Sequence, residues 1–319
     1  MAKKKEFNLA AYKDTIKVSD TPRKKDSYIE LHPCLHEIMG MPGLAQGHIS
    51  QIYGKSDTGK TSFLFHVAAQ CQKQDILPIL IITELKVDWA RATAMGFDRE
   101  NAIVEENIEF IEDVYDFMQK RITDMMKGEL PTNICFLWDS VGNTRSQDEV
   151  EIGKDGYVAR KKGMQVAARA HSNCLRTFTP MINNTTKQTC PYFASALLIN
   201  TGYNKPPTFP GGPTTYVPYG GEKLWFNSSL ILKTARRGKL EATKDKKKVI
   251  FGMSSKIAVE KNHINGISLS GEFAITADEI IPFEKDAIKD YKDRNKDKWG
   301  NVDIEYYKQG EEEDVEDII

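Results

Sequence analysis

The chain has few cysteines and no long apolar run. Its 319 residues include five cysteines, at Cys34, Cys71, Cys135, Cys174 and Cys190, and no two of them form a Cys-x-x-Cys pair. This scatter fits neither a zinc site nor a disulfide framework, so we expect neither zinc nor disulfide bonds. No apolar run reaches the roughly 20 residues that a membrane-spanning helix needs. No apolar segment follows the basic N-terminus MAKKKEF either, so we expect no membrane contact and a cytoplasmic location.

Net charge and internal repeats are also lacking. The formal net charge is −1, and no repeat of about 20 to 50 residues is present, which excludes a solenoid. The charges are unevenly placed, because the N-terminus is rich in lysine whereas the last nine residues, EEEDVEDII, carry six acids and no base. Further basic stretches are ARKK (159–162), TARRGK (234–239) and KDKKK (244–248). Such runs indicate either a solvated surface or a nucleic-acid contact.

The most specific motif present is GKSDTGKT, from Gly54 to Thr61. It follows the strand-like HISQIY and precedes the helical pattern TSFLFHVAAQCQ. This spacing is that of a phosphate-binding loop rather than of a glycine turn with an incidental lysine. In such a loop backbone N–H groups surround the phosphates, Lys60 reaches the β- and γ-phosphates, and the Thr61 hydroxyl holds Mg²⁺. We therefore predict ATP and Mg²⁺ as cofactors. The nucleotide-binding residues are Gly54, Lys55, Ser56, Asp57, Thr58, Gly59, Lys60, Thr61 and Ser62.

Two acids follow apolar, strand-like runs. Asp139 ends ICFLWD, where a P-loop ATPase keeps a carboxylate near the Mg²⁺ shell. Glu84 ends ILPILIITE and is the candidate for orienting or deprotonating the attacking water. We predict Thr61 and Asp139 at the metal, and Lys60 and Glu84 in catalysis. The alternative for each acid is to cap the turn or helix that follows it.

Short apolar runs alternate with helical patterns along the chain. The runs that predict strands cover residues 76–83, 108–111, 134–138, 195–200 and 229–234. Helical periodicity covers residues 114–127 and about 163–179. This alternation predicts an α/β fold with a mostly parallel central sheet flanked by helices on both faces. Two segments break the rhythm, at about 145–162 and in the proline- and glycine-rich 201–221. Both follow strand ends, where ligands of open α/β sheets bind.

The order of these motifs resembles that of the RecA-type recombinases, and more closely of their phage-borne members. The motifs are YGKSDTGKTS, IITEL, FLWDS, EIGKDG, LLIN and YGGEKLWFNSSLILKTARR. The resemblance covers about residues 27 to 282, and its most particular part is Gly-Gly-x-x-Leu-x-Phe after a long loop. It implies a RecA-like P-loop ATPase and DNA-binding core at residues 31–283. An N-terminal polymerisation arm and linker would then occupy 1–30, and a C-terminal appendage with the acidic tail 284–319.

The resemblance assigns two DNA-binding loops. The first contains EIGKDGYV, from Glu151 to Val158, and the second covers residues 202 to about 221. Cations and backbone N–H groups suit the phosphates of single-stranded DNA, and aromatic side chains suit its bases. Each aromatic residue taken alone is equally compatible with packing inside its own loop. The predicted DNA-binding residues are Lys154, Tyr157, Arg160, Tyr203, Lys205, Phe209, Gly220 and Gly221, and the second loop also supplies Tyr216.

The resemblance also implies that a neighbouring subunit completes the ATP site with a late strand. The matching stretch, AVEKNHINGISL, places Lys261 and His263 there. His263 is a departure, since a lysine is usual and histidine is mostly neutral at pH 7. Thr201 is a second departure, because bacterial members carry a glutamine there that links nucleotide to the second loop. We expect this coupling to run through Asn200 or Thr201 instead.

The position of the adenine-stacking aromatic holds Arg91. Trp89 nearby either substitutes for that aromatic or packs in the core. At the N-terminus, EFNLAAYK carries Phe7 and Ala10 at the Phe-x-x-Ala spacing that serves archaeal and eukaryotic relatives as a polymerisation plug. The alternative is a plain amphipathic helix that lies on its own or a neighbouring core.

Taken together, these residues predict an ATP-dependent DNA strand-exchange recombinase that forms helical filaments on single-stranded DNA. The predicted partners are single-stranded DNA, duplex DNA, further copies of the chain, and mediator or single-strand-binding proteins. Two alternatives share the phosphate loop. One is a hexameric DNA helicase with a RecA fold, and the other is a regulator of recombination on the same core that does not hydrolyse ATP.

Overall fold

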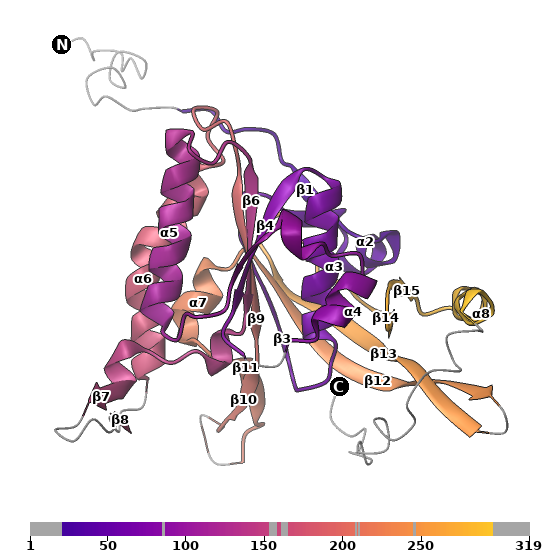
Figure 1. The fold of residues 1–319 in the computed structure, drawn as a ribbon. Coiled ribbons are helices and arrows are strands. Elements are labelled where there is room, and N and C mark those ends of the chain that lie inside the picture. Colours follow the sequence, from indigo (N-terminus) through magenta and orange to yellow (C-terminus); the bar gives the residue numbers. More distant parts are fainter. Residues whose placement is uncertain are drawn as a thin grey trace, which may run out of the picture.

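The computed structural model describes residues 21–84, 87–152, 158–160, 165–207, 209, 211–244 and 247–295. Within these residues a twisted central sheet of nine strands separates two groups of helices (Figure 1). The strand order is β15-β14-β13-β12-β3-β9-β6-β4-β5. The strands are β3 (Ile49–Gly54), β4 (Ile76–Ile82), β5 (Ile103–Glu105), β6 (Asn133–Asp139), β9 (Ala194–Asn200), β12 (Leu230–Lys244), β13 (Lys247–Asn262), β14 (Ser270–Thr276) and β15 (Ile280–Pro282).

The strands from β12 to β5 are parallel, and their carboxyl ends share one edge of the sheet. Tyr53 pairs with Asn200, and Gly54 pairs with Thr234. In the next strands Ile82 pairs with Asp139. Because each crossover carries a helix, both faces of these strands are covered and their apolar runs are unbroken. The predicted α/β fold with a mostly parallel sheet flanked by helices is confirmed.

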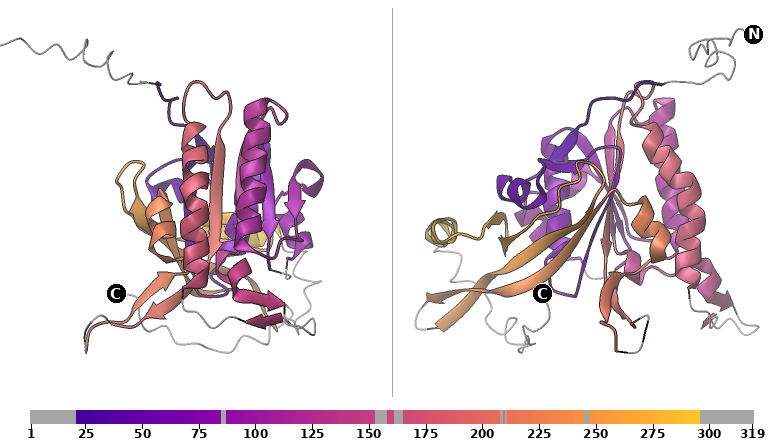
Figure 2. Two further views of the ribbon diagram at one scale, coloured as in Figure 1. Left: turned by 90° about the vertical axis from the view of Figure 1, so that its left-hand side faces the viewer. Right: turned by 180° about the vertical axis from the view of Figure 1, so that it is seen from behind.

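The other strands extend the sheet in antiparallel fashion. β12 and β13 form a hairpin of 15 and 16 residues, of which only Leu230 to Thr234 pairs with β3. The rest projects beyond the core, as both views in Figure 2 show. β14 and β15 then add at the outer edge of β13. The strand predicted at 229–234 is therefore the first third of a much longer one.

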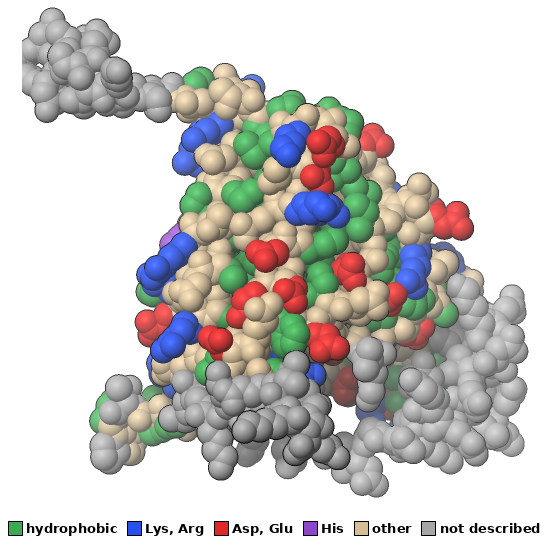
Figure 3. All heavy atoms as spheres, turned by 60° about the vertical axis from the view of Figure 1, so that its left-hand side comes forward, with side chains coloured by type: hydrophobic (Ala, Val, Ile, Leu, Met, Phe, Trp, Pro, Cys, Tyr) green, Lys and Arg blue, Asp and Glu red, His purple; other side chains and the backbone are tan. Residues whose placement is uncertain are grey.

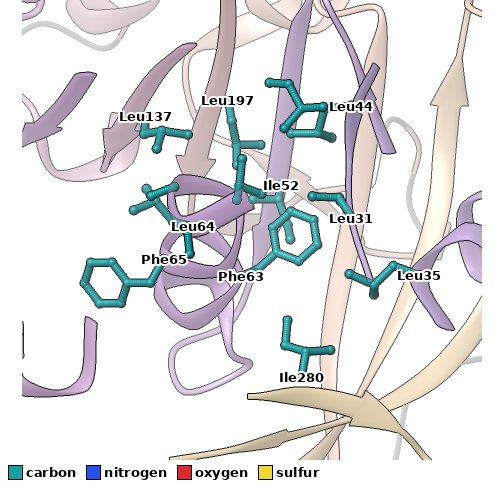
Figure 4. Packing of buried hydrophobic residues seen from close by; sticks show 14 of the residues in the cluster. Leu31, Leu35, Leu44, Ile52, Phe63, Leu64, Phe65, Leu137, Leu197 and Ile280 are labelled. Carbon is teal, nitrogen blue, oxygen red and sulfur yellow. The ribbon is translucent and has the colours of Figure 1, made fainter. Parts of the chain in front are cut away.

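One group of helices covers the face that carries Ile52, Leu137 and Leu197. These helices are α2 (Pro33–Met39), α3 (Lys60–Lys73) and α4 (Trp89–Ala94). Phe63 and Leu64 of α3 are fully buried and lie against the sheet residues (Figure 4). Because α3 starts at the phosphate loop, this packing fixes the loop against the sheet.

A second group covers the opposite face. It consists of α5 (Ile111–Lys127), α6 (Val166–Asn184) and α7 (Gly221–Asn227), whereas α8 (Lys285–Arg294) packs at the outer edge through Tyr291. In α5 the buried residues Val114, Met118, Ile122 and Met125 recur at helical spacing. The predicted helices over 114–127 and 163–179 correspond to α5 and α6.

The strand predicted at 108–111 is wrong. Ile111 begins α5, and Phe110 is the residue that caps it. The acids Glu112 and Asp113 in the first turn favour a helix start at this point, because they face the positive end of the helix dipole. The neighbouring edge strand is instead β5, a few residues earlier.

Three two-stranded antiparallel sheets of the described residues lie outside the central sheet. They are β1 (Tyr28–Glu30) with β2 (Gly43–Ala45), β7 (Val150–Ile152) with β8 (Val158–Arg160), and β10 (Gly202–Lys205) with β11 (Thr215–Pro218). Within the proline- and glycine-rich segment, β10 and β11 contribute four paired residues each, so this segment is not a loop without structure. Residues 1–20 of the predicted arm and linker, with Phe7 and Ala10, and the acidic tail lie outside the described residues, whereas β1, within the predicted linker, pairs with β2 and buries Ile29 in the core. All five cysteines are free thiols, and no described helix is long and apolar enough to cross a membrane.

Candidate nucleotide and DNA sites

The phosphate loop, residues 54–62, joins the end of β3 to the start of α3. Gly59 precedes the helix with a φ of 89°, a conformation that side-chain-bearing residues rarely adopt. A Cβ atom there would lie 2.1 Å from Ile275 Cδ1. A Cβ at Gly54 would lie 2.4 Å from the Thr234 carbonyl oxygen. The two glycines of the motif are therefore required by the close approach of β12 and β14 as well as by any ligand.

Side chains of β12 and β13 form hydrogen bonds with the phosphate loop and with Tyr53 just before it. The Thr58 and Thr234 hydroxyl groups are 2.8 Å apart, and Thr234 Oγ1 donates to the Tyr53 carbonyl at 3.2 Å. Ser255 Oγ of β13 donates to the Thr58 carbonyl at 2.8 Å. These bonds hold the loop in shape without a nucleotide, which lowers the ordering cost of binding one.

Lys60 is almost fully buried at the first turn of α3. Its Nζ donates to the carbonyl oxygens of Gly54 at 2.9 Å and Lys55 at 2.6 Å. Burial lowers the pKa of Lys60, while the carboxylates of Asp139 and Glu84 act in the opposite direction. The ammonium group is thus held against the loop, where a β/γ-phosphate would take over its N–H donors.

Thr61 and Asp139 contact each other beside this lysine. Thr61 Oγ1 donates to Asp139 Oδ2 at 2.9 Å. Asp139 is 4% exposed, and burial, followed by repulsion from Glu84, raises its pKa to about 6. A hydroxyl and one carboxylate suit Mg²⁺, which keeps most of its water and takes few protein ligands when it binds with phosphates. No group of three or more His, Cys, Asp or Glu side chains able to hold a metal occurs in the described part of the chain.

Glu84 stands just past β4, next to the Asp139 end of β6. Its Oε1 accepts hydrogen bonds from Ser140 Oγ and, at 2.5 Å, from Asn143 Nδ2. The Thr83 amide donates to the Asp139 carbonyl at 2.8 Å. The structure therefore brings together Lys60, Thr61, Glu84 and Asp139, whose sequence positions span 80 residues, at one edge of the sheet. It favours a role for Glu84 and Asp139 inside this site over helix capping.

Replacing Asp139 with asparagine should stabilise the free protein at neutral pH. The pKa of Asp139 rises from 3.8 to about 6 on folding, so ionisation above pH 4 destabilises the native state. Asparagine avoids that cost, and we expect a gain of about 1 to 2 kcal/mol at pH 7 that vanishes near pH 4. Urea unfolding at pH 7 and pH 4, without Mg²⁺ or nucleotide, measures this gain in the free energy of unfolding. Asp116→Asn, an exposed acid on α5, is the control, and an equal effect of both variants would refute the argument.

Trp89 and Arg91 are both held by other contacts. The Trp89 ring stacks near Phe97 at 6.3 Å and an interplanar angle of 28°, and the Arg99 guanidinium lies 4.2 Å from its centre. Arg91 Nη2 donates to the Thr276 carbonyl at 3.2 Å. Trp89 therefore packs against the core, which favours the core alternative over base stacking.

Lys261 and His263 lie away from the phosphate loop of their own chain. Lys261 Nζ donates to the carbonyl oxygens of Trp225 at 2.7 Å and Phe226 at 2.9 Å, at the end of α7. His263 follows β13 and is exposed, with its amide bonded to the Ser229 carbonyl. A contact with nucleotide would thus come from a second subunit, and this role stays a prediction.

The predicted DNA-binding residues are distributed over two hairpins. Tyr203 and Lys205 are exposed on β10, and Phe209, at the tip, is 64% exposed. Gly220 and Gly221 have positive φ and start α7, where a Cβ on Gly220 would lie 2.6 Å from Leu224. Lys154 and Tyr157 lie outside the described residues, and Arg160 is placed only as the last residue of β8, paired with Val150. The β7–β8, β10–β11 and β12–β13 hairpins project from the same edge of the sheet (Figures 1 and 2).

Sequence reasoning missed the residues that hold the site in place. Ser140 and Asn143 support Glu84, and Thr234 and Ser255 support the loop. Ser140 and Asn143 follow Asp139 closely in the sequence, so their position just after a strand end could have indicated that they belong to the same site. Thr234 and Ser255 carry no such signal, because they reach the loop only through the fold.

Comparison with known families decides the relationship. The RecA N-terminal domain model matches residues 22–281. The chain belongs to the RecA N-terminal domain family. The RecA-type assignment made from the motif order is confirmed, whereas closeness to phage-borne members stays a prediction.

Individual RecA proteins are similar to the chain at low identity. "Protein RecA" of Nitratidesulfovibrio vulgaris (strain DSM 19637 / Miyazaki F) is 28% identical over 266 residues, which cover 77% of this chain and 66% of the relative. "DNA repair protein recA homolog 1, chloroplastic" of Arabidopsis thaliana is 29% identical over 236 residues, 73% of this chain and 48% of the relative. "Protein RecA" of Streptococcus pyogenes serotype M1 is 26% identical over 271 residues, which cover 77% of this chain and 64% of the relative. The chain thus spans about half to two thirds of these RecA proteins.

Proposed function

We propose that the chain is an ATP-dependent DNA strand-exchange recombinase that assembles as a helical filament on single-stranded DNA. The observation that carries this proposal is that the phosphate loop and the β10–β11 hairpin, with its exposed aromatic side chains, leave the same edge of one sheet. Nucleotide and DNA would then be bound by neighbouring parts of one rigid body. Membership of the RecA family supports the same conclusion.

The described side chains suit hydrolysis of ATP. Lys60 is positioned to neutralise charge on the β- and γ-phosphates, and Thr61 and Asp139 would hold Mg²⁺. When bound, Mg²⁺ supplies charge neutralisation at the phosphate oxygens. Glu84 would orient the attacking water and accept its proton, and Ser140 and Asn143 keep its carboxylate in place. The products are ADP and phosphate. Bound ATP would hold the filament in the form that binds DNA, and hydrolysis would end that form.

Electron microscopy with single-stranded DNA and a non-hydrolysable ATP analogue tests the proposal. Helical filaments are expected, and they should disassemble when ATP replaces the analogue and is consumed. Closed rings would overturn the proposal in favour of a helicase. DNA-stimulated ATP turnover by the wild-type protein separates the recombinase from a regulator that binds nucleotide without hydrolysing it.

Filament assembly gives a prediction for the arm. The arm is basic, and the face that carries α5 and α6 displays acidic side chains at its centre (Figure 3). This charge complementarity supports docking of the arm on a neighbouring subunit. Replacing Phe7 with glutamate would place a charge in any apolar pocket that receives Phe7 on the neighbouring subunit, at a cost of several kcal/mol. Filament length in electron micrographs should collapse while the monomer stays folded. Tyr12→Glu is the control inside the arm, and normal filaments of the Phe7→Glu variant would disprove the plug.

The acidic tail gives a further prediction. Its six acids can compete with DNA phosphates for basic side chains such as Arg236, which is exposed on the β12–β13 hairpin. Deleting residues 311–319 should tighten DNA binding most at low salt, and duplex DNA should gain most. Affinity measured against salt concentration for both proteins tests this. Parallel curves of equal affinity would mean that the tail only adds solvated charge.

A further inference from the structure

A chain of side-chain contacts begins at the residue before the phosphate loop. Tyr53 precedes Gly54, and its ring is 1% exposed. Its hydroxyl donates to Glu260 Oε2 at 2.5 Å, and Glu260 Oε1 lies 3.4 Å from Lys233 Nζ. Thr234, the residue after Lys233, bonds both to Thr58 and to the Tyr53 carbonyl. Tyr53 is therefore tied to the loop along the chain and, through β12 and β13, across the sheet.

The same ring contacts the β10–β11 hairpin. Tyr53 and Tyr216 are stacked, with ring centroids 6.0 Å apart and an interplanar angle of 17°. The Tyr216 hydroxyl accepts the amide hydrogen of Gly202 at 3.0 Å, at the start of β10. Gly202 pairs with Pro218 at the base of the hairpin. One aromatic pair thus connects the phosphate-loop strand to both strands of the hairpin.

Asn200 and Thr201, where coupling was expected, lie beside Gly142, since a Cβ atom there would be 2.3 Å from Thr201 Oγ1 and 3.2 Å from Asn200 Oδ1. Asn200 Nδ2 donates to the Tyr219 carbonyl at 2.8 Å, next to Pro218 at the base of the hairpin. In the described residues, neither side chain forms a hydrogen bond with residues 54–62. Tyr53, which directly precedes the loop, contacts the hairpin itself through the Tyr216 ring.

We expect nucleotide binding to change the loop next to Tyr53. Lys60 Nζ is bonded to the Gly54 and Lys55 carbonyl oxygens, and a phosphate would compete for the same N–H groups. The carbonyl that loses its partner belongs to the residue adjacent to Tyr53. A shift of the Gly54 backbone would be transmitted to Tyr216. The reason is that the buried Tyr53 ring is held by a charge-assisted hydrogen bond to Glu260 on one side and by the stacked Tyr216 ring on the other.

We propose that Tyr53, Glu260 and Tyr216 couple nucleotide binding in the phosphate loop to the position of the β10–β11 hairpin. The inference rests on the proposed function, since it takes the hairpin as a DNA contact. Coupling of this kind is reciprocal, so DNA tightens nucleotide binding by the same factor by which nucleotide tightens DNA binding. In this proposal the three residues act as positioning residues, through the phosphate loop and the hairpin.

The experiment measures the affinity of a non-hydrolysable ATP analogue with and without a saturating thymidine oligonucleotide. In the wild-type protein the two affinities should differ by about 5- to 150-fold, the usual range for coupled sites. In the variants Tyr53→Phe, Glu260→Gln and Tyr216→Leu the factor should fall to below about twofold, while affinity without DNA changes little. Tyr53→Phe keeps the ring and its burial, so it remains informative if Tyr216→Leu does not fold. Melting temperatures report folding for each variant.

Tyr203→Leu is the matched control. Tyr203 lies on the same hairpin, and its ring packs against Tyr219 with the ring centroids 5.0 Å apart, whereas Tyr216 is the residue that stacks on Tyr53 of β3. Its loss should weaken DNA binding and leave the coupling factor at saturating DNA unchanged. If the coupling factor is unchanged in Tyr53→Phe and Glu260→Gln, or falls equally in Tyr203→Leu, the inference is overturned and the proposed function is not. If the wild-type protein binds the ATP analogue equally well with and without DNA, both the inference and the proposed function are overturned.

Discussion

Replacing Lys60 with alanine is expected to abolish ATP turnover, with a loss of about 1000-fold or more in kcat. The reason is that the Lys60 ammonium is held by the Gly54 and Lys55 carbonyl oxygens inside the loop, where the phosphates would lie. A preorganised charge in a buried site stabilises developing phosphate charge far better than one in water. Steady-state phosphate release with saturating DNA measures the effect.

Lys55 provides the matched control for this variant. It belongs to the same loop, but its side chain is exposed. Lys55→Ala should therefore change turnover by less than about tenfold, because an exposed charge is screened by water. Turnover of Lys60→Ala at a level similar to that of Lys55→Ala would remove the buried lysine from the mechanism.

Replacing Glu84 with glutamine should preserve nucleotide binding and reduce hydrolysis by about 100- to 10,000-fold, the usual contribution of a general base. The substitution is close to isosteric, and the amide oxygen can still accept the hydrogen bonds from Ser140 and Asn143. The side chain would stay in place and lose only its capacity to take a proton. Filaments formed with ATP should then persist on DNA.

Nucleotide affinity by calorimetry and single-turnover hydrolysis separate the two effects of this change. Glu106→Gln, at an exposed glutamate paired with Arg99, is the control and should behave as the wild type. Hydrolysis by Glu84→Gln at the wild-type rate would show that another group activates the water. A loss of nucleotide binding would instead assign Glu84 a structural role in the site.

The residues at the strand ends illustrate what could be predicted. Asp139 and Glu84 could be placed together because each ends an apolar run, and parallel strands bring their carboxyl ends to one edge. The strand at 108–111 could not be rejected, since a short apolar run does not distinguish a strand from the first turn of a helix. Ile111 belongs to α5 because its side chain completes the buried stripe of that helix.

The sequence by itself determined the phosphate loop, the alternation of strands and helices, and the family. These properties are local, since the predicted nucleotide-binding residues of the loop are nine consecutive residues and each apolar run reflects its own burial. Only the tertiary structure decided the partners that cross the sheet. Ser255 reaches Thr58 over 197 residues of sequence, and Tyr53 meets Glu260 over 207. Such contacts depend on the register between β3, β12 and β13, which hydrogen bonding and packing set jointly across the sheet and which no single segment encodes.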